Sequence, residues 1–288
     1  MFGIVAAVPT PVSNNGAPLH EDFISHCKWV LAHGCDGINI LGSTGEANSI
    51  NASERIKLMK LAASQLSKER LMVGTGTPSL FETIRLTKVA SDLGYKIALV
   101  LPPYYYKPVT NLGLFNWYKT LHTKLGPREI KVFFYNFPQM TGVTIPIQVI
   151  EKLNKLFPHR FGGIKDSSGD LAYCRSLAKI ENFRVFPSSE VSLSESYTSN
   201  FAGCISATVN QTSELCAIAW KNRASQNTDL IEKIKIIREK IAAESLVASI
   251  KFLVSERTQN RDWCHILPPL TKLTKKRKQE LLIAKQLF

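Results

Sequence analysis

Lys165, at the end of a short apolar run in the sequence FGGIKDSSGD, has the residue type and setting that suggest covalent chemistry. A lysine ammonium loses hydration in apolar surroundings, which favours the neutral amine. A neutral amine attacks a ketone and forms a Schiff base, so Lys165 is a candidate covalent catalyst. The alternative is a structural salt bridge, but neighbouring Asp166 would face the other side of a strand.

Tyr135 and the turn Gly42-Ser43-Thr44-Gly45 also follow apolar runs. A tuned phenol passes protons to and from a reacting group, although an aromatic at a rim is the simpler interpretation. The hydroxyls and N–H groups of a glycine-bounded turn can hold a carboxylate, or they can merely cap the turn. The six histidines show no H-x-x-x-H or H-E-x-x-H spacing, so we expect no metal site.

Eight short apolar runs, many of them β-branched, recur along the chain at residues 3–8, 36–41, 71–75, 97–101, 131–135, 161–165, 184–186 and 203–206. Near-continuous apolar runs of this length are typical of parallel strands buried on both faces. Helix-like segments separate them, so the alternation predicts a (β/α)8 TIM barrel. Because active sites of such barrels lie at the carboxyl ends of the strands, the candidate residues fall where chemistry is expected.

The segments between the runs carry helix start signals. Ser53 and Ser79 are the expected N-caps of the second and third helices, and Pro146 stands near the first turn of a later one. Residues 213–260 show more helical periodicity than one closing helix needs. We therefore expect a barrel over residues 1–222 and an appended C-terminal helical region over residues 223–288.

The formal net charge of +13 is partly concentrated in LTKLTKKRKQELL near the C-terminus, where leucines 270, 273 and 281 predict an amphipathic helix after Pro268-Pro269. A charge run usually faces water, and no nucleic-acid motif accompanies it. No stretch approaches the roughly 20 apolar residues of a membrane span, and no signal peptide is evident. Six cysteines without a C-x-x-C pair indicate reduced, mostly buried thiols in a cytoplasmic protein.

Four motifs together resemble the family of dihydrodipicolinate synthase and N-acetylneuraminate lyase: LGSTGE (41–46), PYYYKP (103–108), YNFPQMTG (135–142) and GIKDSSGD (163–170). The N-terminal VPTPV and the late LPPLTKL also fit, so the resemblance covers nearly the whole chain. It implies a pyruvate-dependent class I aldolase on a (β/α)8 barrel. It also implies no cofactor other than the covalent imine with substrate pyruvate, and a homotetramer built as a dimer of dimers.

The resemblance assigns roles residue by residue. Lys165 matches the lysine that condenses with the pyruvate ketone, and Tyr135 matches the tyrosine that shuttles protons. Ser43 and Thr44 match the pair that grips the pyruvate carboxylate, with Thr44 also relaying protons to Tyr135. Tyr105 matches a tyrosine that reaches into a neighbouring subunit's site, although a plain subunit contact is the simpler interpretation from its sequence alone.

Other residues concern the edge of the pyruvate site and the second substrate. The backbone carbonyl of Ile205 is expected to border pyruvate. Met140 stands where dihydrodipicolinate synthases carry an arginine, and a thioether cannot bind a carboxylate as an arginine fork does. Glu190 matches the first of two adjacent carboxylates that bind the polyol tail in sialic acid lyases, whereas Val191 occupies the second position. Ser167 and Ser189 are the remaining candidates for binding hydroxyl groups.

These features favour a pyruvate-dependent aldolase acting with a small aldehyde or keto acid, such as a 2-keto-3-deoxy acid aldolase. A 4-hydroxy-tetrahydrodipicolinate synthase and an N-acetylneuraminate lyase are the alternatives within the family. A non-catalytic keto-acid-binding barrel is an alternative of another class, against which the set Lys165, Tyr135, Ser43 and Thr44 argues. A nucleic-acid-binding protein is suggested only by net charge, so we expect neither a nucleic acid nor a membrane as partner.

Overall fold

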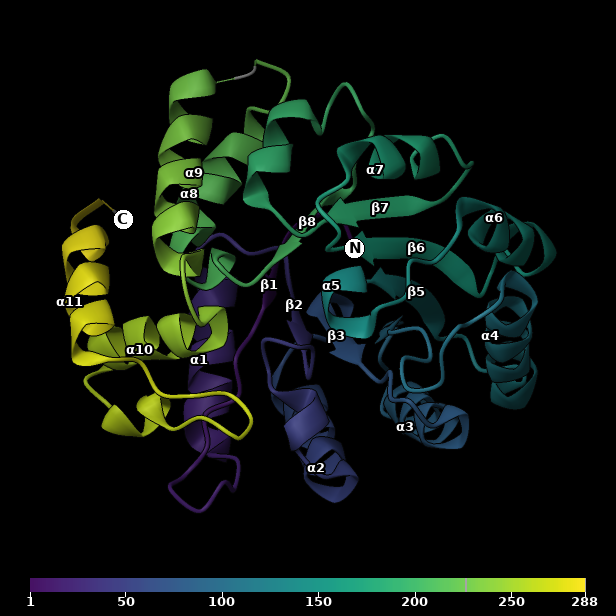
Figure 1. Cartoon of the computed structure of the whole chain (residues 1–288), viewed down its shortest axis with the longest axis horizontal. Helices are drawn as coiled ribbons and strands as arrows, with labels where there is room; N and C mark the ends of the chain where they lie inside the picture. Colours follow the sequence, from purple (N-terminus) through teal and green to yellow (C-terminus); the bar gives the residue numbers. More distant parts are fainter. Residues whose placement is uncertain (226, 288) are drawn as a thin grey trace.

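Eight parallel strands form a nearly closed barrel in the computed structural model, which describes residues 1–225 and 227–287 (Figure 1). The strands are β1 (Gly3–Ala7), β2 (Gly37–Ile40), β3 (Leu71–Gly74), β4 (Ile97–Val100), β5 (Lys131–Asn136), β6 (Phe161–Asp166), β7 (Arg184–Pro187) and β8 (Gly203–Ser206). Their order around the sheet is β7-β6-β5-β4-β3-β2-β1-β8. At the remaining seam, Ala202 N donates to Val185 O at 2.9 Å. The predicted barrel and all eight predicted strands are confirmed.

Alternate residues of most strands belong to two separate apolar cores. In β1, Ile4 and Ala6 belong to the large core between the strands and the surrounding helices. Val5 and Ala7 belong to a second core, which also contains Phe133 of β5. Successive side chains of a strand point to opposite faces of the sheet. Because both faces of this sheet are buried, most strand residues are apolar and the sequence does not alternate between apolar and polar residues.

Eleven α-helices occur among the described residues. They are α1 (His20–Ala32), α2 (Ala52–Gln65), α3 (Leu80–Asp92), α4 (Asn111–Leu125), α5 (Pro138–Thr141), α6 (Ile147–Leu156), α7 (Leu171–Leu177), α8 (Val209–Lys221), α9 (Thr228–Ala242), α10 (Leu246–Thr258) and α11 (Lys275–Ala284). Short 3-10 helices are η1 (Ala47–Ser49), η2 (Lys68–Arg70), η3 (Glu190–Glu195), η4 (Arg261–Cys264) and η5 (Lys285–Leu287).

The predicted helix starts are confirmed in two of three cases. The Ser79 side chain accepts from Glu82 N at the start of α3, and Pro146 directly precedes α6. The prediction for Ser53 is wrong, because the N-cap of α2 is Asn51, whose side chain accepts from Glu54 N at 3.0 Å. Ser53 lies inside the first turn and donates to that same amide oxygen.

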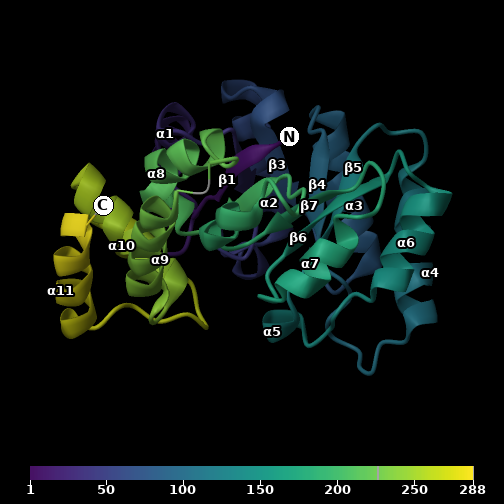
Figure 2. The same ribbon diagram turned by 90° about the horizontal axis from the view of Figure 1, so that it is seen from above.

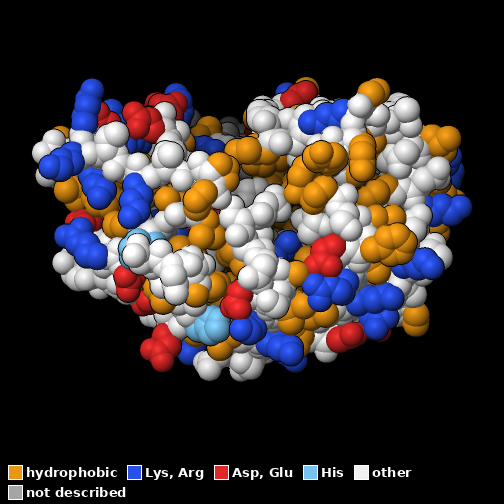
Figure 3. Space-filling model, turned by 60° about the horizontal axis from the view of Figure 1, so that its bottom comes forward, with side chains coloured by type: hydrophobic (Ala, Val, Ile, Leu, Met, Phe, Trp, Pro, Cys, Tyr) orange, Lys and Arg blue, Asp and Glu red, His pale blue; other side chains and the backbone are white. Residues whose placement is uncertain are grey.

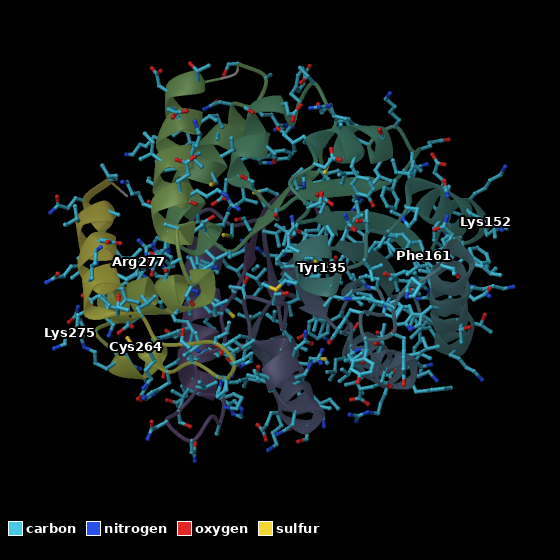
Figure 4. The ribbon with its side chains drawn as sticks, in the orientation of Figure 1. Tyr135, Lys152, Phe161, Cys264, Lys275 and Arg277 are labelled. Atoms are coloured by element: carbon cyan, nitrogen blue, oxygen red, sulfur yellow. The ribbon has the colours of Figure 1, made fainter. Side chains whose placement is uncertain are left out.

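The C-terminal helices α9, α10 and α11 lie beside the barrel, on the side opposite α4 and α6 (Figures 1 and 2). Buried polar contacts fasten them. His26 of α1 bonds Asn210 of α8 and Arg257 of α10. Arg277 of α11, labelled in Figure 4, donates to Ile241 O of α9. The appended helical region is thus confirmed, whereas a domain boundary at residue 222 stays a prediction.

The basic C-terminal segment differs in detail from its prediction. Helix α11 begins only at Lys275, so Leu270 and Leu273 precede it, and Arg277 is buried between helices. Lys272, Lys275 and Lys276 are exposed, whereas Lys278 is partly buried over the Phe252 ring. Figure 3 shows Lys and Arg gathered along the left edge, where α11 lies in Figure 1.

The six cysteines are unpaired, and all but the partly exposed Cys264 are buried, as predicted. Among residues 1–225 and 227–287, no helix is both long and apolar enough to span a membrane.

Candidate active site

Lys165 and Tyr135 lie side by side at the carboxyl ends of neighbouring strands. They are register partners in the parallel pairing of β5 with β6. Lys165 Nζ donates to the Tyr135 hydroxyl at 3.4 Å and lies 4.5 Å from the centroid of its ring. Both residues are 4% exposed, and Tyr135 lies near the middle of the barrel in Figure 4. A buried amine and a phenol therefore meet where the barrel opens.

Asp166 does not pair with Lys165, in agreement with the alternation of side chains along β6. Its carboxylate accepts from Asn136 Nδ2 at 2.7 Å and from the backbone N and hydroxyl of Ser168. Burial raises the pKa of Asp166, and these hydrogen bonds oppose the shift. The carboxylate thereby holds the loop after β6, and Lys165 forms no ion pair among the described residues.

The turn after β2 brings Ser43 to the same place. Gly45 N donates to Gly42 O, and Thr10 donates its hydroxyl proton to Gly45 O at 2.9 Å, which fixes the turn. The hydroxyls of Ser43 and Tyr135 are 3.4 Å apart. Thr44 is buried beside them but makes no hydrogen bond to Tyr135 within the described chain, so it is Ser43 that contacts the phenol.

A cavity of about 540 Å³ surrounds these side chains, a size common for small-molecule sites. It unites most of the predicted site residues, namely Ser43, Thr44, Tyr135, Met140, Lys165, Ser167 and Ile205. Tyr104, whose pKa is raised by burial, and Ser188 also line it. No group of three or more His, Cys, Asp and Glu side chains suited to a metal ion occurs in residues 1–225 and 227–287.

Three predicted site residues lie outside this lining. The Tyr105 side chain is 74% exposed and packs edge-on against Tyr106. The Ser189 hydroxyl accepts from Val191 N and so caps η3. Glu190 is fully buried and does not line the cavity. Its carboxylate contacts other protein side chains.

The partners of Glu190 form a network that sequence reasoning missed. Its carboxylate accepts from Arg238 Nη1 at 2.6 Å and from the hydroxyls of Ser206, Thr208 and Thr212. Arg238 comes from α9 and reaches the cavity wall, with its side chain 22% exposed. No motif marks Arg238, because its position depends on how α9 packs and not on a barrel strand.

The C-terminal region supplies one whole wall of the cavity. Ser245, Leu246 and Val247 at the start of α10 line it, together with Pro269 and Leu270 from the segment before α11. The sequence pattern predicted helices at 245–247 and at Leu270 and assigned these residues no role, because their approach to the barrel mouth is a tertiary contact.

The sequence and the fold of this chain are similar to those of one family of known proteins. The family model described as "Dihydrodipicolinate synthetase family" matches residues 1–286. A 4-hydroxy-tetrahydrodipicolinate synthase of Coxiella burnetii is 28% identical over 259 residues, covering 88% of this chain and 87% of that one.

Two solved structures match over the full length of this chain. The dihydrodipicolinate synthase of Agrobacterium tumefaciens is 26% identical with a TM-score of 0.89, covering 100% of both chains. YagE, a prophage protein of E. coli crystallised with pyruvate, is 24% identical with a TM-score of 0.88, covering 98% of that chain. The chain therefore belongs to the dihydrodipicolinate synthetase family of pyruvate-dependent, Schiff-base class I aldolases and synthases.

Proposed function

We propose that Lys165 is the Schiff-base lysine and that the enzyme joins pyruvate to, or releases it from, an aldehyde. The observation that carries this proposal is the contact of Lys165 Nζ with the Tyr135 hydroxyl, which itself lies 3.4 Å from Ser43 Oγ. An amine that attacks a ketone must lose protons and expel water, so a phenol within reach of the nitrogen is the group the reaction needs.

The chemical steps follow from these residue types. Lys165 Nζ adds to the pyruvate ketone, and the carbinolamine loses water to give an iminium. The iminium draws electrons from the methyl group, which loses a proton and becomes an enamine. The enamine carbon attacks the aldehyde carbon, whose oxygen takes up a proton, and water then hydrolyses the new iminium. Tyr135 moves protons at the carbinolamine oxygen and the aldehyde oxygen, and cleavage is the same sequence in reverse.

The turn at residues 42–45 is the proposed binding site of the pyruvate carboxylate. Ser43 and Thr44 offer hydroxyls, and backbone N–H groups of such a turn attract an anion. Ile205 of β8 lines the same cavity, two strands from β2 in the sheet order, which supports the proposed place of its carbonyl beside pyruvate. The solved YagE chain holds pyruvate, in line with this first substrate.

The aldehyde is proposed to be a short hydroxylated one, so that the product is a 2-keto-3-deoxy acid. Ser167 and Ser188 line the cavity beyond Lys165 and can bind hydroxyl groups. Met140 has no charge to offer a carboxylate and is 71% exposed. Arg238 also lines the cavity, but its guanidinium is paired with the Glu190 carboxylate at 2.6 Å, so it does not replace the missing arginine at position 140.

We also propose a homotetramer. Tyr105 and Tyr106 are 74% and 84% exposed, and Phe81 is 71% exposed. Large aromatic side chains are enriched at the buried centres of subunit interfaces. Light scattering coupled to size exclusion tests this, and a monomer at micromolar concentration would contradict it.

Borohydride trapping tests the covalent step. The protein is incubated with pyruvate, reduced, digested and analysed by mass spectrometry, and the expected result is a reduced pyruvate adduct on Lys165. Lys165→Ala should give no adduct. Folded wild-type protein without an adduct would overturn the proposed function and favour a barrel that only binds keto acids.

An aldehyde screen with the pyruvate-loaded enzyme then identifies the second substrate. Turnover with hydroxylated aldehydes well above that with aspartate semialdehyde supports the proposal. The reverse preference would make the chain a 4-hydroxy-tetrahydrodipicolinate synthase, the name carried by the Coxiella burnetii relative. Release of pyruvate from N-acetylneuraminate would instead identify a sialic acid lyase.

A further inference from the structure

The turn that carries Ser43 and Thr44 is tied to the C-terminal region through one buried carboxylate, that of Glu46. Its Oε1 accepts from Lys251 Nζ at 2.6 Å, and its Oε2 accepts from Leu267 N at 2.6 Å. The side chains of Glu46 and Lys251 are each 1% exposed. Both oxygens of Glu46 are thus bound by groups more than 200 residues away along the chain.

The β2–α2 loop, which contains this turn, also contacts the cavity wall through Ser49. Ser49, at the end of η1, donates its hydroxyl proton to Pro268 O at 3.0 Å. Pro269 and Leu270, which follow, line the cavity. Three hydrogen bonds therefore join the β2–α2 loop to the C-terminal region at the barrel mouth: Lys251 of α10 and Leu267 N donate to Glu46, and Ser49 donates to Pro268 O.

The two residues that flank the turn have left-handed backbone conformations. Leu41 and Glu46, which flank it, have φ values of 54° and 53°. This left-handed region is unfavourable for residues with a side chain and persists only where surrounding contacts impose it. Glu46 N also donates to Ser43 O at 3.1 Å, so the position of Glu46 bears directly on that of Ser43.

We propose that Glu46 and Lys251 are positioning residues for pyruvate: the C-terminal region, through this ion pair, holds the 42–45 turn in the geometry that binds the substrate carboxylate. The inference rests on the proposed function, in which Ser43 and Thr44 bind that carboxylate. Glu46 lines the cavity, but both of its carboxylate oxygens are bound by Lys251 Nζ and Leu267 N, so the pair acts on pyruvate through the turn.

Lys251→Met is the direct test, because methionine fills a similar volume without the charge. It leaves a buried carboxylate with Leu267 N as its remaining donor, which favours water entry or movement of Glu46. The half-saturating pyruvate concentration for borohydride trapping on Lys165 should rise about tenfold, since small misplacements of binding groups are costly. The KM for the aldehyde and the trapping rate at saturating pyruvate should change by less than about twofold.

Arg277→Met is the matched control. Arg277 is also buried and ties α11 to α9 through Ile241 O, but it does not contact the 42–45 turn. The variant should lower the unfolding temperature while leaving half-saturation by pyruvate unchanged. Glu46→Gln combined with Lys251→Met removes both charges and should retain the weakened pyruvate binding.

The outcomes separate this inference from the proposed function. Wild-type protein that forms no adduct overturns the proposed function. An adduct in wild type, with unchanged half-saturation in folded Lys251→Met, overturns only the positioning role. An equal loss of pyruvate binding in Arg277→Met would likewise overturn it, by indicating general destabilisation. If Lys251→Met does not fold, the double variant decides by the same criterion.

Discussion

Replacing Arg238 by methionine should destabilise the protein through Glu190, a residue that the cavity does not reach. The two side chains form a 2.6 Å ion pair in which Glu190 is 0% exposed and Arg238 is 22% exposed. Arg238→Met removes the cation and leaves the carboxylate in place. Three hydroxyls, those of Ser206, Thr208 and Thr212, still donate to Glu190, so it loses its charge partner but not all of its hydrogen bonds.

The size of the effect follows from this geometry. Breaking a buried ion pair by removing one partner costs about 3–5 kcal/mol. The three remaining hydroxyl donors, together with the partial exposure of Arg238, place the expected cost at the lower end, about 3 kcal/mol. For a chain of this length, about 2 °C per kcal/mol gives a fall in Tm of roughly 6 °C.

Glu190→Gln should cost less, about 1 kcal/mol, because the partly exposed Arg238 can turn toward water when its partner is neutral. The double variant Glu190→Gln/Arg238→Met should be more stable than Arg238→Met alone, since no buried charge is left unpaired. Urea unfolding followed by circular dichroism measures all three free energies. A cost below about 1 kcal/mol for Arg238→Met, or a larger cost for Glu190→Gln, would refute the reasoning.

Tyr135→Phe should lower kcat by about a hundredfold or more while some pyruvate adduct on Lys165 still forms, and unchanged steady-state turnover would contradict the proton role. His26 is buried and neutral, and burial lowers its pKa to about 3. The unfolded chain binds a proton at His26 near pH 6.5, whereas the folded chain does not, so the free energy of unfolding should fall as the pH drops below 6.5, by roughly 3 kcal/mol at pH 4. In unfolding experiments, His26→Gln should make the free energy of unfolding less dependent on pH in this range. Asn51→Ala should cost about 1 kcal/mol of unfolding free energy and Ser53→Ala less than about 0.5, and equal costs would contradict the assignment of the cap.

Part of the site could be predicted because it depends on strand geometry alone. Lys165 and Tyr135 end neighbouring apolar runs, and parallel strands bring their carboxyl ends to one edge, so their proximity followed once the barrel was recognised. The turn after β2 was found for the same reason. The resemblance implied that Thr44 relays protons to Tyr135, whereas the hydroxyl that contacts the phenol is that of Ser43, because the orientation of neighbouring hydroxyls depends on turn dihedrals that no local sequence pattern records.

The aldehyde side escaped prediction for the opposite reason. Glu190 follows β7 as a candidate ligand would, yet η3 turns it inward toward α8 and α9, where hydroxyls and Arg238 surround it. Whether a carboxylate faces a cavity or a helix is decided by packing between segments about 50 residues apart, which no local pattern records.

The cavity is lined partly by residues at the strand ends and partly by residues of the C-terminal region. Lys165 and Tyr135, the proposed centre of the pyruvate chemistry, are fixed by pairing between buried strands, where a shift of one residue would turn every side chain to the other face. The facing wall, with Leu246, Val247 and Leu270, is built from helices and a loop outside the barrel, which can change without disturbing any strand register. Changes in aldehyde preference are therefore expected from substitutions in this C-terminal wall, and loss of the pyruvate adduct from substitutions at the strand ends.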